Sequence, residues 1–155
     1  MATYNFKSVG KTQTQKKDEA LESSPTPYGI KTPMQIGKKD GIFVMNYDLA
    51  DQFADNLKNL LLTNWGERLG LYDYGANLRP LTTELVSLED FDTNAIDRIK
   101  SAVERWMPFI DLEDFTSSID NVNNVSTGII NITVTYNIPA LQVSKRAIQV
   151  TLYVI

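Results

Sequence analysis

The sequence contains no cysteine and no histidine, and this absence decides most of the chemistry that the chain could perform. Cysteine nucleophiles, imidazole bases, Ser-His-Asp triads and Cys/His zinc sites are all excluded. Carboxylates, lysines, tyrosines and hydroxyls remain, and a pair of carboxylates is what glycan hydrolysis requires. Glu67, two residues after Trp65, is the candidate acid for such a reaction.

A glycosidase needs two carboxyl groups about 5–9 Å apart, and an apolar pocket that raises the pKa of the acid. The adjacent Arg68 acts in the opposite direction, because a guanidinium favours the ionised form of Glu67. The other acidic residues fall on expected helix faces and turns, where solvated charge is normal. We therefore expect no catalytic residue, no cofactor, no small-molecule substrate and no metal, and keep glycan hydrolysis as the weaker alternative.

Arg68 has a planar guanidinium that suits a bidentate contact with a carboxylate. Glu67, Asp73 or Glu84 could supply that carboxylate, either within the chain or across a contact between subunits, and the sequence leaves both arrangements open. The aromatic residues nearby are expected to anchor a core or an interface rather than to stack on a sugar. These aromatic residues are Trp65, Tyr72 and Tyr74.

The chain has 155 residues, of which 43% are hydrophobic and 22% charged, and these values are typical of one globular domain. No segment approaches the roughly 20 apolar residues of a membrane span, so no membrane is expected as a partner. Residues 1–40 contain seven lysines against four acidic residues, a balance of +3, and the remainder carries −7. The predicted organisation is an extended basic N-terminal arm over residues 1–40 and a globular domain over residues 41–155.

A basic arm could bind nucleic acid or an acidic neighbouring subunit. Its aromatic residues do not alternate with the lysines between residues 7 and 22, as a stacking surface for bases would require, so no nucleic acid is expected. The domain is predicted to begin near Gly41, with residues 42–45 as a short buried strand.

Two amphipathic helices are predicted in the middle of the chain. The first presents apolar residues at helical spacing from Leu49 to Leu61 and is expected to end at Gly66. The second runs on to Trp106 and is ended by Pro108. The candidate N-caps are Asn46 or Asp48 for the first helix and Asp92 or Thr93 for the second.

The C-terminal third changes to a period of two, which is typical of strands with one buried face. Apolar and polar residues alternate over 130–138 and 148–154, and the short connection over 141–146 predicts an antiparallel hairpin. A weaker strand is expected alongside, over 110–119. The predicted class is α+β, with two main helices packed on a small, mainly antiparallel sheet, a C-terminal β-hairpin and an extended N-terminal arm.

Residues 56–78 contain a recognisable pattern. An apolar helix leads into Leu-x-Thr-x-x-Gly-Glu-Arg over residues 61–68, and the pair Tyr74-Gly75 follows, with Leu78 three residues further on. A helix ending in Trp-x-Pro and a final hairpin come next. This order resembles the family of contractile-tail baseplate wedge and sheath-initiator proteins, also called tail protein W or the tail-lysozyme-like domain, and the resemblance covers roughly residues 41–155.

The resemblance implies a structural baseplate protein that docks on the wedge and templates sheath assembly through its C-terminal hairpin. The implied partners are the tail sheath protein, other baseplate wedge subunits, and central hub or tube proteins. The implied location is the tail baseplate of a virion, with assembly in the host cytoplasm. The equivalent subunit of a type VI secretion system or of an extracellular contractile injection system is the alternative, since fold and mechanism are shared.

After the second helix the family usually has Trp-Glu-Pro-Arg, whose acid and base are implicated in wedge docking. This chain has Trp-Met-Pro-Phe there, so apolar burial or a contact elsewhere must replace a charge-assisted contact. The candidate wedge-docking residues are Glu67, Arg68, Trp106, Met107, Pro108 and Phe109. The residues expected to define the sheath-pairing hairpin are Ile132, Val134, Tyr136, Val150, Leu152 and Val154.

Overall fold

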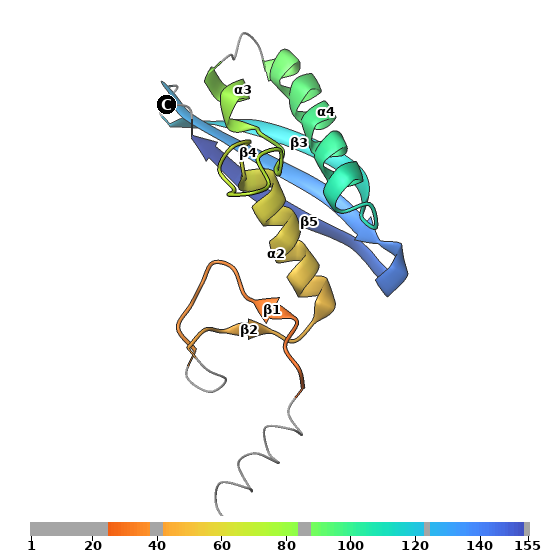
Figure 1. Ribbon diagram of the computed structural model, residues 1–155. Helices are drawn as coiled ribbons and strands as arrows, with labels where there is room; N and C mark the ends of the chain where they lie inside the picture. The colour runs from red at the N-terminus through yellow and green to blue at the C-terminus, as the bar shows by residue number, and fades with distance from the viewer. Residues whose placement is uncertain (1–24, 38–41, 84–87, 123–124, 154–155) are drawn as a thin grey trace, which may run out of the picture.

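A computed structural model describes residues 25–37, 42–83, 88–122 and 125–153 (Figure 1). Within these ranges the chain forms an α+β fold with one two-stranded and one three-stranded antiparallel sheet, as predicted. None of the helices in this part of the chain is both long and apolar enough to span a membrane. In chain order the elements are β1 (Gly29–Ile30), β2 (Met45–Asn46), α2 (Leu49–Leu62), α3 (Arg79–Thr83), α4 (Leu88–Trp106), β3 (Asp111–Val122), β4 (Val125–Ile138), η1 (Pro139–Leu141) and β5 (Val143–Tyr153).

The three-stranded sheet has the order β3-β4-β5, so both the predicted C-terminal hairpin and the weaker strand beside it are confirmed. One face of β4 and β5 is buried, and a slip of one residue would expose every side chain on that face. This is why the register is well determined. The buried residues are Ile130, Ile132, Val134, Tyr136 and Ile138 on β4, and Ile148, Val150 and Leu152 on β5.

The first helix, α2, is capped by Asp48, whose carboxylate accepts the backbone N–H of Ala50 at 3.0 Å. Of the two predicted caps, the second is therefore the one used. The helix ends at Leu62, earlier than the predicted stop at Gly66, because the Thr63 hydroxyl donates to the Asn59 carbonyl at 2.6 Å and its backbone turns extended.

The second long helix, α4, begins at Leu88, so the prediction that Asp92 or Thr93 caps it is wrong. Both residues lie inside the helix and have other partners. The Thr93 hydroxyl donates to the Glu89 carbonyl, and Asp92 accepts a hydrogen bond from the Ser117 hydroxyl of β3. The helix ends before Pro108, as predicted, since proline cannot continue the ladder.

The helices lie on one face of the three-stranded sheet, and the core lies between the two layers (Figure 1). Helix α2 contributes three buried leucines, and α4 contributes a stripe of apolar residues at helical spacing. None of the helices formed by the described residues lies on the opposite face of the sheet. The helical residues of the core include Leu57, Leu60 and Leu61 on α2, and Phe91, Ala95, Ile99 and Val103 on α4.

The prediction of a buried strand over residues 42–45 is wrong. Ile42 is 74% exposed, and the strand of this region is β2, which pairs with β1 in a separate two-stranded ribbon at the N-terminal end of α2 (Figure 1). Asp55 of α2 holds the ribbon by accepting the Asn46 side-chain amide at 2.7 Å and the Thr32 backbone N–H at 2.9 Å. This pairing crosses the predicted boundary between arm and domain, and residues 1–24 of the arm lie outside the described residues.

Candidate assembly surfaces

Strand β5 forms one edge of the three-stranded sheet, and in the described part of the chain no strand pairs with its outer side. Its pairing with β4 runs without a shift over eight residue pairs, from Arg146 opposite Tyr136 to Tyr153 opposite Ile129. A long, regular edge of this kind presents a row of unpaired backbone groups to another chain. It is the surface that the sequence analysis assigned to sheath pairing.

The predicted hairpin residues lie where the alternation placed them. Ile132, Val134, Tyr136, Val150 and Leu152 are all buried beneath the helices, and Val154 lies outside the described residues. These buried side chains therefore fix the register of the hairpin and do not themselves reach a partner. The groups able to bind an added strand are the outward backbone N–H and C=O groups of β5.

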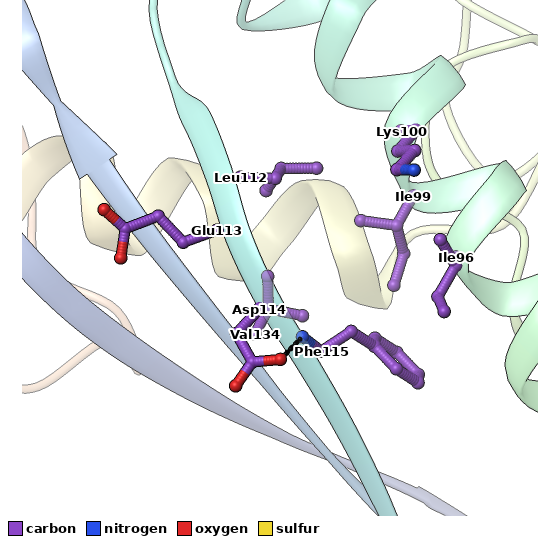
Figure 2. A pocket seen from close by; sticks show the side chains of 8 residues that line it. All are labelled: Ile96, Ile99, Lys100, Leu112, Glu113, Asp114, Phe115 and Val134. Atoms are coloured by element: carbon purple, nitrogen blue, oxygen red, sulfur yellow. Dashed lines mark hydrogen bonds between the residues drawn. The ribbon is translucent and has the colours of Figure 1, made fainter.

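Strand β3 forms the other edge, and it is irregular where β5 is regular. Its register shifts between Leu112 and Asp114 and again between Ile119 and Asn121. The Asp114 carboxylate also accepts the backbone N–H of Phe115 at 2.9 Å, so that amide already has a partner (Figure 2). Bulges and charged residues are the means by which sheets protect an edge from pairing.

Two ionic contacts tie the start of β5 to the rest of the domain. Arg146 donates to Asp51 of α2 at 2.8 Å, and this hydrogen bond raises the pKa of the guanidinium. Lys145 lies 3.9 Å from Glu113 on β3. Beside Arg146, burial raises the pKa of the Tyr136 phenol, which stays neutral inside the core.

The loop over residues 63–78 contains the Gly-Glu-Arg turn. The Glu67 carboxylate accepts the backbone N–H of Asn64 at 2.8 Å and its side-chain amide at 3.0 Å. These hydrogen bonds lower the pKa of Glu67, so the carboxylate is ionised and closes the turn. Gly66 and Gly75 have φ of 86° and 115°, which favours glycine at both positions.

Arg68 does not form the predicted ion pair with a carboxylate in the described residues. Its guanidinium instead lies over the ring of Tyr74, 4.0 Å from the centroid. Of the three proposed partners of Arg68, Glu67 accepts hydrogen bonds from Asn64, Asp73 pairs with Arg105, and Glu84 lies outside the described residues.

An aromatic stack joins this loop to the end of α4. The Tyr74 ring meets the Trp106 ring edge-on at 5.2 Å, and Arg105 lies over the other ring of the pair, 5.1 Å from the Trp106 centroid. The Trp65 indole donates to the Gly75 carbonyl at 3.1 Å. The stack therefore brings two of the predicted docking residues, Arg68 and Trp106, to the same part of the molecule. Between loop and helix lies a cavity of about 250 Å³ lined by Trp65, Asp73, Asp97, Arg98, Arg105 and Trp106.

The remaining predicted docking residues, Met107, Pro108 and Phe109, differ in how much of each side chain is exposed. Met107 is buried in the core, and its backbone N–H donates to the Val103 carbonyl at 2.8 Å. Pro108 is exposed, and Phe109 is 38% exposed with its ring 4.6 Å from that of Phe53 on α2. Met107 is thus buried in its own domain, and Phe109 packs on Phe53 while remaining partly exposed.

Two groups of apolar side chains are exposed, on the loop and on the ribbon, and the sequence analysis left open whether Trp65 and Tyr72 of the loop belong to the core or to an interface. Leu69 on the loop is 96% exposed, and Ile36 on the ribbon is 83% exposed. The exposed loop residues, named here the loop surface, are Trp65, Leu69, Leu71 and Tyr72. Those of the ribbon are Tyr28, Ile30, Met34, Ile36, Ile42, Phe43 and Tyr47.

Comparison with known proteins identifies the fold. No protein-family model matches the sequence, and no curated protein matches it. A crystal structure of a protein from Geobacter sulfurreducens, provisionally named a tail lysozyme, is similar with a TM-score of 0.58 and 18% identity over 70% of this chain and 93% of that one. A chain in the six-fold symmetrised baseplate of the anti-feeding prophage has a TM-score of 0.51 and 17% identity, over 81% and 84%. The chain therefore has a fold of the contractile-tail baseplate type.

Proposed function

We propose that this protein is a structural component of a contractile-tail baseplate, and that its β5 edge binds a strand of the tail sheath protein. The observation that carries the proposal is the difference between the two edges of one sheet. The outer side of β5 is regular and no strand of the described residues pairs with it, whereas β3 is bulged and has its Phe115 amide occupied by Asp114. A sheet built to avoid pairing altogether would protect both edges.

Strand addition would use the backbone of β5 from Arg146 to Tyr153. Alternate residues of a strand direct both backbone groups to the same edge, so about four residues of this segment face outward. Each added hydrogen bond contributes only about 1 kcal/mol net, so several must form together. The buried side chains of β5 hold the strand straight beforehand, which lowers the ordering cost of binding.

Docking on other baseplate wedge subunits is assigned to the loop surface and to the stack beside it. Leu69 and Tyr72 expose apolar side chains, and within the described residues the Arg68 guanidinium lies over the Tyr74 ring and forms no ion pair. Glu67 supports this surface from within by closing the turn. Met107 is excluded from direct docking by its burial.

A glycan hydrolase is the second candidate, favoured by the name of one structural neighbour. The hydrogen bonds that lower the pKa of Glu67 are the reverse of what a general acid needs, and Asp73 is held by Arg105. We therefore assign no enzymatic role. Clearing of a peptidoglycan gel by the protein, lost in Glu67→Gln or Asp97→Asn, would contradict this assignment.

The sheath proposal can be tested with one cysteine on each edge, because the natural chain has none. Gln149 on β5 and Thr116 on β3 both pair with Thr133 and are both exposed, so they form a matched pair across the sheet. Gln149→Cys carrying a bulky maleimide-polyethylene glycol should give baseplates without sheaths by negative-stain microscopy. The same label on Thr116→Cys should leave sheaths of normal length.

Normal sheaths on both labelled proteins would overturn strand addition at β5. Sheath loss with the Thr116 label alone would place the sheath contact at β3.

Docking has its own test, since Leu69→Asp should prevent incorporation into baseplates while circular dichroism and thermal unfolding stay unchanged. Incorporation at the normal level would remove the loop surface from the docking contact. A phage tail and a secretion or injection machine share this mechanism, and the neighbouring genes would separate them.

A further inference from the structure

A second surface feature lies on the far side of the domain from β5, between α4 and β3. Two adjoining cavities of about 250 and 550 Å³ share Lys100 and Leu112 in their walls and together form one groove along the helix. Figure 2 shows Ile96 and Ile99 on α4 and Leu112 and Phe115 on β3, with the groove between these two elements. The apolar lining consists of Ile96, Ile99, Val103, Ile110, Leu112 and Phe115.

The floor of this groove is apolar and its rim is acidic. Ile96, Leu112 and Phe115 remain half-exposed there, with no described residue covering them. Around them, three carboxylates without an ion pair in the described structure face one ammonium group. The carboxylates are Glu104, Asp111 and Asp114, and the ammonium is that of Lys100. Glu113 is not counted, because its carboxylate accepts from Asn137 at 3.1 Å and pairs with Lys145.

We propose that this groove binds residues 4–9 of the chain's own N-terminal segment. Tyr4, Phe6 and Val9 are apolar residues at close intervals, and Lys7 lies among them. An extended segment of six residues spans about 20 Å. The groove follows α4 from Ile96 to Glu104, about 12 Å at the rise of a helix, and continues past the end of the helix to Pro108. The segment is therefore long enough to fill the groove, and the two agree in polarity and in sign of charge.

The connection between the segment and the described domain is fifteen residues long. Residues 10–24 can extend to about 50 Å, which exceeds the length of about 28 Å of α4, the longest helix of the described residues. A tether of this kind gives the segment an effective concentration of about millimolar at the groove of its own chain. Side chains rather than backbone pairing make the contact, since Asp114 occupies the Phe115 amide. The inference does not depend on the proposed sheath pairing.

Disulfide trapping in the full-length protein tests the contact. Lys100 is exposed in the middle of the groove, so Phe6→Cys with Lys100→Cys should oxidise to an intramolecular disulfide in most molecules under mild conditions. The matched control is Phe6→Cys with Thr116→Cys, exposed on β3 near the same groove but on the outer face, and it should cross-link at least ten-fold more slowly. Peptide mapping by mass spectrometry identifies the bonds.

A second measurement removes the dependence on a disulfide. The single cysteine of Lys100→Cys should react with a maleimide several-fold faster when Tyr4→Ser and Phe6→Ser are added, because the groove is then uncovered. Equal reactivity with and without those two changes would overturn the proposal. Equal cross-linking at both positions, or cross-links only between two molecules, would overturn it as well, the latter by placing the segment on another copy.

Discussion

The two edges of the three-stranded sheet share the central strand β4, yet they differ in every feature that governs strand pairing. Strand β5 runs in unbroken register from Arg146 to Tyr153, whereas β3 shifts register twice within twelve residues. At β3 the Asp114 carboxylate takes the Phe115 amide, while the charged residues of β5 lie only at its start. Register shifts and one local carboxylate contact therefore distinguish the irregular edge at β3 from the regular edge at β5.

Under the two proposals made above, the two sides of the domain have separate tasks. The regular edge is suited to backbone recognition, which imposes direction and register on an added strand. Beside the irregular edge lies the groove lined by Ile96, Leu112 and Phe115, which is suited to side-chain recognition. A single small sheet can thus serve two contacts without one competing for the other.

The largest effect is expected where both edges depend on one residue. Ile132 is fully buried on the central strand, so Ile132→Ala should lower the free energy of unfolding by about 2–5 kcal/mol through the cavity it leaves. Both edges would lose order together. Chemical denaturation measures the change, with Ile36→Ala on the exposed ribbon as a control expected within about 0.5 kcal/mol of the natural protein. A loss below 1 kcal/mol would show that β4 is not the shared support.

The difference between the two edges should disappear if β3 is made able to pair with another chain. Asp114→Ala frees the Phe115 amide and removes one negative charge from β3, so the variant should associate with itself as its concentration rises. Sedimentation velocity measures this association. Glu89→Ala, which removes an exposed charge of the same sign from α4, should stay monomeric under the same conditions. A monomeric Asp114 variant would mean that the bulges alone close the edge.

A smaller effect is expected at the start of β5. Arg146→Gln loses the contact with Asp51 that ties this strand to α2, and because both side chains are partly exposed the cost should be about 0.2–1 kcal/mol. Lys145→Gln, whose pair with Glu113 is longer and more exposed, should change stability less. Thermal unfolding of the two variants side by side provides the test. Equal losses would show that Arg146 has no special part in holding the open edge.

The smallest effect concerns the loop beside the end of β5, where Glu67 lies with Tyr153 around a cavity of about 350 Å³. The pKa of Glu67 in the folded protein is below its ordinary value of 4.5, because Asn64 donates to the ionised form. The contribution of this carboxylate to loop stability is therefore complete above about pH 4.5 and is lost as the pH falls through the lower folded pKa. The NMR chemical shift of the Asn64 backbone amide should change with pH in that range, because it reports the protonation of Glu67. In Glu67→Gln that transition should be absent, and its persistence would assign the shift to another group.

Much of the fold could be predicted because its signals are local. The alternation from Ile130 to Ile138 set the buried face of β4, and the spacing of Leu57, Leu60 and Leu61 set that of α2. Both are periodic patterns that can be recognised in the sequence without knowing which other segments pack against them. The start of α4 was predicted too late because Asp92 and Thr93 are good caps by type, and tertiary contacts with Ser117 and the helix itself used them otherwise.

The candidate sites were less predictable, because they depend on contacts between distant residues. Arg68 was paired with a carboxylate by charge alone, yet the loop brings the Tyr74 ring beneath it. Met107 looked like a replacement contact for a charged residue, and the end of α4 turns it into the core. No periodic pattern indicates the exposure of Leu69, and only the folded chain reveals it on the surface.

The sequence by itself determined the class of fold and the register of the hairpin, because a period of two with one apolar face allows few arrangements. It also determined the absence of thiol and imidazole chemistry, since the residues are missing. The tertiary structure decided which edge of the sheet is open. That choice depends on the two register shifts of β3 and on which strand lies in the middle, and both are properties of pairing between segments distant in sequence.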